Sequence, residues 1–264
     1  MIVFETTQPF EVDDGLPDWV ELQPGENWVS MSNSLTRAAH GLTLSEKRIV
    51  SAALAQLDSK RKPKVGELIT FRLNALDYAE SFGVDSDTAY SQLKEASKKL
   101  RGRYISFHDP AFIRKGKPLK TTQMNWIGSI TYHDGQGWVE LTFNPQLLPH
   151  IMGITAARGN FTSYQLGQAS ALRSIYSWKL LELLMRFQST GWAQYTIEDF
   201  SASMDATESQ RSDFAKIRTK IIEPAIKELT EKDNWVIKWQ PIKSGRKVTA
   251  LRFDFERNPQ ERLF

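Results

Sequence analysis

The segment FAKIRTKIIEPAIKEL (Phe214–Leu229) and the two segments behind it, WVIKW (Trp235–Trp239) and VTALRFDF (Val248–Phe255), decide the fold. Apolar residues in the first segment recur at the spacing of an amphipathic helix, which we predict over roughly residues 212–232. The next two segments have the composition of strands, and the turn IKSGRK (Ile242–Lys247) joins them into a hairpin. The proline of the first segment lacks an N–H and clashes one turn back, so we expect a kink there, or a helix that starts close to it.

Positive charge is concentrated on this helix and hairpin. Five basic residues and no acidic one lie between Asp233 and Asp254, and no acidic residue lies between Phe214 and Ile222. A basic helix followed by a basic hairpin is typical of a winged helix, whose helix enters the major groove of DNA while the hairpin tip contacts phosphates or the minor groove. The candidate DNA-binding residues here are Ser212, Lys216, Arg218, Thr219 and Lys220 on the helix and Lys243, Arg246 and Lys247 on the hairpin.

The same order of elements is predicted once earlier in the chain. A helix near Asp87–Arg101 is followed by a strand over Arg103–His108, a basic stretch, and a strand pair over Met124–His133 and Gly137–Phe143. Its candidate DNA-binding residues are Lys94, Lys98, Arg101, Lys115, Lys117 and Lys120. The fold class is therefore α+β, with two tandem winged-helix domains, each a small helical bundle with a β-hairpin wing.

Charge also divides the chain along its length. The whole sequence of 264 residues has a net charge of +3, but residues 1–26 hold seven acidic residues and no basic one. The rest therefore keeps 34 basic against 24 acidic residues, a net charge of +10, as nucleic-acid binders with an acidic tail do. We predict an acidic flexible arm over residues 1–27, a first domain over 28–150 that contacts the DNA backbone and dimerises, and a second over 151–264 that reads sequence.

The sequence lacks the motifs that several functional classes require. The sequence has no cysteine, its four histidines are scattered without a His-x-His pair, and it has no GxxxxGK[ST] loop. Thiolate metal sites, nicking initiators and ATPases are therefore disfavoured, and we expect no enzyme activity, cofactor or metal. No apolar run approaches 18 residues and no secretory signal is recognisable, so we expect a cytoplasmic protein that has no membrane partner.

Three stretches resemble a known family. FTSYQLGQASALRSIYSWKLLELLMRF (Phe161–Phe187) and the Phe214–Leu229 segment resemble the second winged helix of the Rep_3 family of plasmid replication initiators, and MSNSLTRAAHGLTLSEKRIVSAALAQL (Met31–Leu57) resembles that family's opening signature. The resemblance covers about residues 28–256. Ile217 stands where the family usually has an aromatic residue. Lys220 stands where it has arginine, and lysine cannot make the bidentate contact of arginine to guanine.

The resemblance implies a protein that binds double-stranded DNA at the direct repeats, or iterons, of a plasmid origin. It further implies opening of an adjacent AT-rich segment, recruitment of the host initiator DnaA and the replicative helicase, and a homodimer in equilibrium with monomer. The dimer would repress its own gene at an operator inverted repeat. We expect dimer surfaces at the opening of the first domain (Trp28, Val29, Met31 and Leu35) and on its long hairpin, for instance at Trp138 or Val139, although these residues could equally form ordinary core.

The residues themselves leave two functions open. A replication initiator and a plain transcriptional repressor with two winged helices need the same DNA contacts, and the family resemblance favours the initiator. A scaffold that binds protein partners is disfavoured by two acid-free basic hairpins.

Overall fold

The computed structural model describes residues 27–108, 113–114, 117–118, 120–154 and 161–258. The predicted acidic arm lies outside these residues except for Asn27, whose backbone carbonyl accepts a hydrogen bond from the Leu166 amide at 2.8 Å. Among the described residues no helix is long and apolar enough to cross a membrane.

The first half contains a winged helix, in which a three-stranded antiparallel sheet of order β2-β8-β7 packs with three helices. The spacing of Thr43 and Glu46 in the sequence predicts a capping box at the start of α2, and the structure contains it: Thr43 accepts from the Glu46 amide and Glu46 from the Thr43 amide. Gly83, with φ of 56°, ends the second helix in the left-handed region that glycine tolerates. The elements are α2 (Leu44–Ala55), β2 (Thr70–Asn74), α3 (Ala75–Phe82), α4 (Ser86–Leu100), β7 (Ile127–His133) and β8 (Trp138–Phe143).

The second half repeats this arrangement. Its sheet has the order β10-β12-β11, so in both halves the strand between the first two helices pairs with the last strand of the hairpin. The elements are α7 (Ile175–Met185), β10 (Trp192–Thr196), α8 (Ile197–Ser203), α9 (Glu208–Arg211), α10 (Phe214–Ile217), the π-helical turn η4 (Arg218–Ile222), α11 (Glu223–Asp233), β11 (Trp235–Ser244) and β12 (Lys247–Arg257). The predicted fold of two tandem winged helices is confirmed.

One predicted strand of the first half is in fact two. Residues 124–133 were expected to form one strand, but Trp126 is buried and separates β6 (Thr121–Asn125) from β7. β6 pairs with β3 (Tyr104–His108) and β7 pairs with β8, so the chain changes partner at this tryptophan. The short pair β4 (Ile113–Arg114) and β5 (Lys117–Pro118) lies between β3 and β6.

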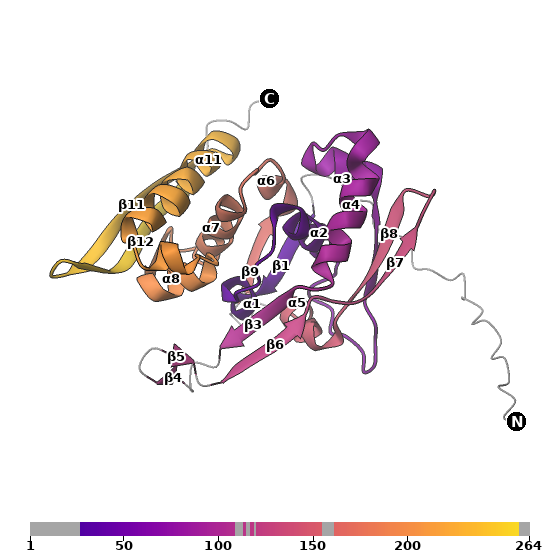
Figure 1. Cartoon of the computed structure of the whole chain (residues 1–264), viewed down its shortest axis with the longest axis horizontal. Helices are drawn as coiled ribbons and strands as arrows, with labels where there is room; N and C mark the ends of the chain where they lie inside the picture. Colours follow the sequence, from indigo (N-terminus) through magenta and orange to yellow (C-terminus); the bar gives the residue numbers. More distant parts are fainter. Residues whose placement is uncertain (1–26, 109–112, 115–116, 119, 155–160, 259–264) are drawn as a thin grey trace, which may run out of the picture.

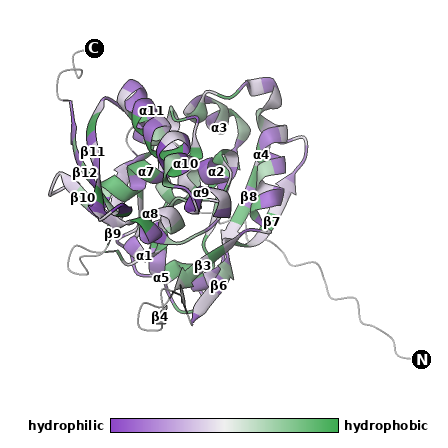
Figure 2. Cartoon of the chain, turned by 60° about the vertical axis from the view of Figure 1, so that its left-hand side comes forward, coloured by the Kyte–Doolittle hydropathy of each residue, from purple (hydrophilic) through white to green (hydrophobic). Residues whose placement is uncertain are grey.

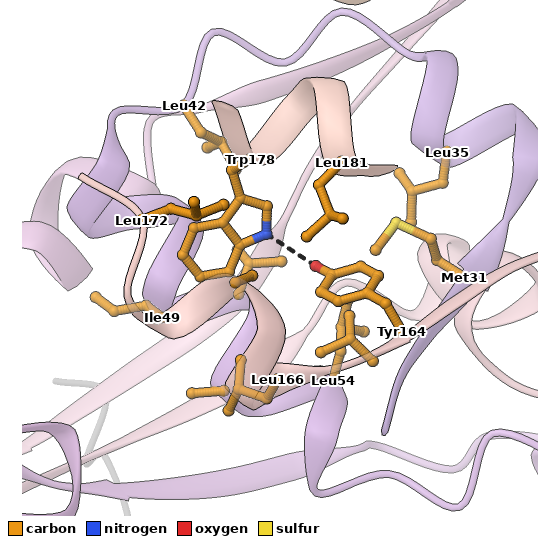
Figure 3. Close-up of a cluster of buried hydrophobic side chains, with 14 of the residues drawn as sticks. Met31, Leu35, Leu42, Ile49, Leu54, Tyr164, Leu166, Leu172, Trp178 and Leu181 are labelled. Carbon is orange, nitrogen blue, oxygen red and sulfur yellow. Dashed lines mark hydrogen bonds between the residues drawn. The ribbon is translucent and has the colours of Figure 1, made fainter. Parts of the chain in front are cut away.

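The two halves share one core. β1 (Trp28–Ser32) pairs antiparallel with β9 (Phe161–Gln165), and buried residues form a single hydrophobic cluster that runs through both halves. Figure 3 shows its centre, where the Trp178 indole donates to the Tyr164 hydroxyl at 2.9 Å. The β1–β9 pairing crosses the boundary predicted after residue 150, and that boundary stays a prediction. The remaining elements are α1 (Asn33–Arg37), the 3₁₀ turn η2 (Pro145–Leu147), α5 (Leu148–Ile151) and α6 (Leu166–Ser170).

The two hairpins project from the body on opposite sides. In Figure 1 the tip of β7–β8 lies at the right and the tip of β11–β12 at the left, with the helices between them. Figure 2 shows hydrophobic residues gathered on inner elements such as α7 and β8, and hydrophilic residues on α11 and the outer strand β11. The polar surfaces of the helices and hairpins are therefore the ones offered to a partner.

Four residues proposed for the dimer surface do not fit that role. Val139 is fully buried on the inner face of β8, because the alternation of the strand turns its side chain inward. Val29, Met31 and Leu35 are buried in the core. Trp28 is 53% exposed, and Trp138 is partly exposed. Of these six residues, the two tryptophans are the ones that a partner could contact.

Candidate nucleic-acid interface

The helix predicted to read bases begins later than expected. Ser212 lies at the end of α9, where its hydroxyl donates to the Ser209 carbonyl at 3.1 Å. Asp213 caps α10 by accepting a hydrogen bond from the Ala215 amide at 2.9 Å, which fixes the helix start at Phe214. Ser212 therefore precedes the reading helix instead of lying on it.

A π-helical turn replaces the kink expected at Pro224. The Glu223 amide bonds to the Arg218 carbonyl, five residues back, and α11 then begins at Glu223 with Pro224 in its first turn. The wider π-helical turn shifts the preceding carbonyls relative to the proline ring, which relieves the clash that an interior proline makes in an α-helix. The alternative expectation, a helix starting close to Pro224, is confirmed for α11.

The exposed face of this helix carries three of the predicted contact residues. Lys216, Thr219 and Lys220 are exposed, while Ile217 and Ile221 on the other side are buried. The Lys216 ammonium donates to the Ser209 hydroxyl at 2.9 Å. The Thr219 hydroxyl donates to the Ala215 carbonyl at 2.8 Å, so towards DNA it is an acceptor and suits the amino groups of adenine or cytosine.

Ion pairs separate the predicted cations of the second half into two groups. The Arg218 guanidinium lies 3.5 Å from the Glu223 carboxylate, which partly compensates its charge. The described residues provide no ion pair for Lys220 or for the cations of the hairpin tip, Lys243, Arg246 and Lys247. These four side chains are exposed and keep their full charge for phosphates.

The hairpin itself is longer and its turn tighter than predicted. β11 runs to Ser244 instead of Trp239, and Gly245 and Arg246 alone form the turn. Gly245 has φ of 60° at the first turn position, which a glycine adopts without strain. Pro241 falls within β11 because β11 pairs on one side only, so the missing N–H faces away from the sheet.

In the first half, Lys94 is occupied by a protein partner. Its ammonium lies 2.7 and 2.9 Å from the two carboxylate oxygens of Asp134 in the β7–β8 turn, and the Tyr90 hydroxyl donates to the same carboxylate at 2.8 Å. The bonds from Lys94 and Tyr90 lower the pKa of Asp134, and desolvation together with this carboxylate raises the pKa of Tyr90 to about 12. These residues fasten the hairpin tip to α4.

The other predicted cations of the first half divide by position. Lys98 in the last turn of α4 and Arg101 just behind it are exposed, and neither forms an ion pair within the described part of the chain. Lys120 is exposed beside β6. Lys115 lies outside the described residues, and of Lys117 the structure gives the place of its backbone in β5.

The sequence did not predict the side-chain contacts that hold these DNA-facing surfaces in place. Tyr90 and Asp134 are 44 residues apart, and their contact depends on the packing of α4 against the hairpin. Arg103, directly behind α4, donates to both carboxylate oxygens of the buried Glu46 at 3.0 Å and so ties the end of that helix to α2. The periodicity of each helix carries no signal for pairs at such separations.

Comparison with known proteins identifies the family. Residues 28–185 match the family model described as "Initiator Replication protein, WH1", and residues 196–255 match the one described as "Initiator Rep protein, WH2". The chain belongs to the Rep_3 family of initiator replication proteins. The first matched region contains the first winged helix and runs on through α7, and the second contains the rest of the second winged helix; the family is one of DNA-binding initiators.

Two curated relatives from Escherichia coli match this Rep_3 chain over most of their length. An "Uncharacterized 27.6 kDa protein" is 28% identical over 231 residues, which cover 84% of this chain and 93% of that protein. The "PI protein" is 26% identical over 247 residues, covering 84% of this chain and 80% of that protein. Among solved structures, "Pi initiator protein in complex with iteron DNA" has a TM-score of 0.75 at 24% identity and covers 90% of this chain and 100% of that one. This last likeness confirms the fold.

Proposed function

We propose that this Rep_3 protein initiates plasmid replication by binding iteron DNA, with both winged helices of one monomer on a single direct repeat. The observation that carries the proposal is the pair of tandem heads, each with exposed cations that have no ion pair among the described residues. Family membership supports the role in initiation, and the structural neighbour that was crystallised with iteron DNA supports this kind of target.

In the second head the α10–η4 segment enters a major groove. Lys216, Thr219 and Lys220 face base edges and the phosphates that flank them, and the tip of the β11–β12 hairpin lies along the backbone. Lys220 contacts a phosphate or a single acceptor of guanine, since an ammonium cannot form the fork of a guanidinium. This head supplies most of the sequence specificity.

In the first head the α4 cations contact the backbone. Lys98 and Arg101 lie where the helix ends, and Lys120 adds a charge from the β3–β6 ribbon. Lys94 acts through Asp134 by holding the hairpin tip beside the helix. Two heads that read one side of the duplex are spaced about one helical turn apart, which gives a site of roughly 20 bp per monomer.

The finer steps of initiation belong to the same proposal. Monomers arrayed on iterons open an adjacent AT-rich segment and recruit DnaA and the replicative helicase in the bacterial cytoplasm. A homodimer binds the operator inverted repeat and represses the gene. Strand β7 suits a dimer contact, because it pairs with β8 on one side only and carries the exposed Tyr132.

The test is a replication assay in cells together with a footprint. A plasmid whose origin carries iterons beside an AT-rich stretch should be maintained when this protein is supplied, and footprinting with mass determination should show one monomer on each protected repeat of about 20 bp. A protein that protects the operator but supports no replication from such an origin would instead be a repressor. A dimer on each single repeat would refute the two-headed monomer.

A further inference from the structure

A set of charged side chains at the junction of the two winged helices has no part in the DNA contacts described above. Asp205, in the turn behind α8, lies 2.6 Å from the Lys179 ammonium and accepts a hydrogen bond from the Gly41 amide at 2.9 Å. Lys179 is 3% exposed and also donates to the Ser203 carbonyl at 3.0 Å. Separating this ion pair is costly, because the buried ammonium of Lys179 would be left without a partner or water.

The contact between Asp205 and Gly41 crosses between the two winged helices, because Gly41 lies behind α1 in the first half and Asp205 behind α8 in the second. Lys179, on α7 of the second winged helix, holds the Asp205 carboxylate in place. A second contact runs parallel at the rim, where the Arg37 guanidinium lies 3.2 Å from Asp199 on α8. The carboxylate of Asp205 thus joins the loop behind α1, the helix α7 and the turn behind α8.

The state of His40 fits this arrangement. Its Nδ1 lies 3.7 Å from Asp205 but accepts a hydrogen bond from the Leu42 amide at 3.3 Å, so this nitrogen carries no proton. Burial, with Lys179 and Lys47 close by, holds the pKa of His40 well below its usual range. The negative charge of Asp205 is therefore matched by Lys179, and the histidine is neutral.

The backbone conformation of Asp205 directs its carboxylate towards the first domain. Its φ of 50° lies in the left-handed region, which aspartate and asparagine enter more readily than most residues. This conformation ends α8 and places the carboxylate over the first domain, where α1 and α8 are in contact. α8 in turn packs against β10 and against β12, a strand of the second wing.

We propose that Asp205 and Lys179 are positioning residues that set the distance and rotation between the two DNA-reading heads, and so determine which spacing of half-sites within a repeat the protein accepts. The proposal rests on the two-headed binding proposed above. A fixed orientation lets both heads engage at no further entropic cost, which for linked binding modules is worth about 10²–10⁴-fold in affinity.

The first measurement needs no DNA. The sequence has no cysteine, so Leu76→Cys on α3 and Thr230→Cys on α11, both exposed positions, give a pair of spin labels across the junction. The parent should show one narrow distance distribution, and Asp205→Asn or the double variant Asp205→Asn/Lys179→Met should broaden it. Asparagine keeps the left-handed backbone, and methionine removes the charge that would otherwise be buried without a partner. Glu67→Gln, which breaks the exposed Arg61–Glu67 pair, is the matched control.

The second measurement uses DNA with one to four base pairs inserted between the half-sites. The parent should prefer the natural spacing by about 100-fold or more, and the junction variants by less than about tenfold, with affinity for each half-site alone unchanged. A folded variant that keeps both the narrow distribution and the spacing preference overturns the proposal. So does failure of both variants to fold, which would make the pair a folding element. If the parent binds no repeat, the proposed function fails, and the distance distributions still decide the positioning role.

Discussion

Removing the three charges at the tip of the second wing should weaken binding through phosphates alone. Lys243, Arg246 and Lys247 surround the two-residue turn, are exposed and have no ion pair among the described residues. Their positions at the end of a projecting hairpin place them far from the core, so the triple alanine variant should fold with unchanged stability.

The magnitude follows from counterion release. Each phosphate contact contributes about 0.9 to the slope of log K against log salt, so three contacts contribute about 2.7. Between 50 and 200 mM salt this difference corresponds to roughly 40-fold, so the parent should lose about 40-fold more affinity than the variant over that range. Because phosphates carry no sequence information, cognate and random DNA should be weakened about equally.

The assay is fluorescence anisotropy with a labelled iteron duplex and a random duplex at several salt concentrations. A matched control removes the same net charge from the loop before β2, as Lys60→Ala/Lys62→Ala/Lys64→Ala. The parent slope should be roughly −5 to −9, as expected for about 6–10 contacts. A change in slope below about 1 in the wing variant, or an equal change in the control, would show that the wing does not lie on the backbone.

Three further predictions concern the reading helix, the core and acid stability. Lys216→Ala and Lys220→Ala should each weaken cognate DNA by about 1–3 kcal/mol and random DNA by less, and equal weakening of both in competition binding would assign them to phosphates. Val139→Asp should unfold the first domain, since the side chain is fully buried, and a normal thermal transition would contradict its place in the core. His40 is neutral when folded and protonates in the unfolded chain below its ordinary pKa of 6.5, so stability should fall with pH below that value by up to about 1.4 kcal/mol per unit. His40→Gln should flatten this dependence in urea titrations near pH 7.5, 6 and 5, and parallel losses in both proteins would mean that His40 is not the group responsible.

Local patterns in the sequence predicted those features that depend only on nearby residues. The periodicity of the reading helix, the alternation of the strands and the capping box at Thr43 depend on neighbours within a few residues, and each of these is present in the structure. The predictions that were wrong concern features that depend on tertiary contacts. The break at Trp126 depends on a buried pocket for the indole, and the extension of β11 through Pro241 depends on which edge of the sheet that strand occupies.

The contacts that hold the candidate interface in place could not be predicted from local sequence patterns, because they too depend on tertiary packing. Lys94 was predicted to contact DNA because it lies on the polar face of a helix, and the structure pairs it with an aspartate 40 residues away. The Lys179–Asp205 pair joins α7 to the turn behind α8, and this contact depends on how the second winged helix packs. A positive side chain on a helix face therefore indicates exposure, and its partner has to be found in three dimensions.

The π-helical turn connects the proline to the reading surface. An ordinary α-helix through residues 214–233 would place Pro224 in its interior, where its ring meets the carbonyl four residues back. Widening the turn at Arg218–Ile222 removes that clash, and the added residue lets Ile217, Ile221 and Ile222 all face the core. The cations before the proline then stay in the solvent while α11 restarts with its apolar residues against α7. Pro224 thus marks the boundary between the segment that faces DNA and α11, which anchors that segment. The cations of the first segment can face the solvent while the apolar residues of α11 face the core.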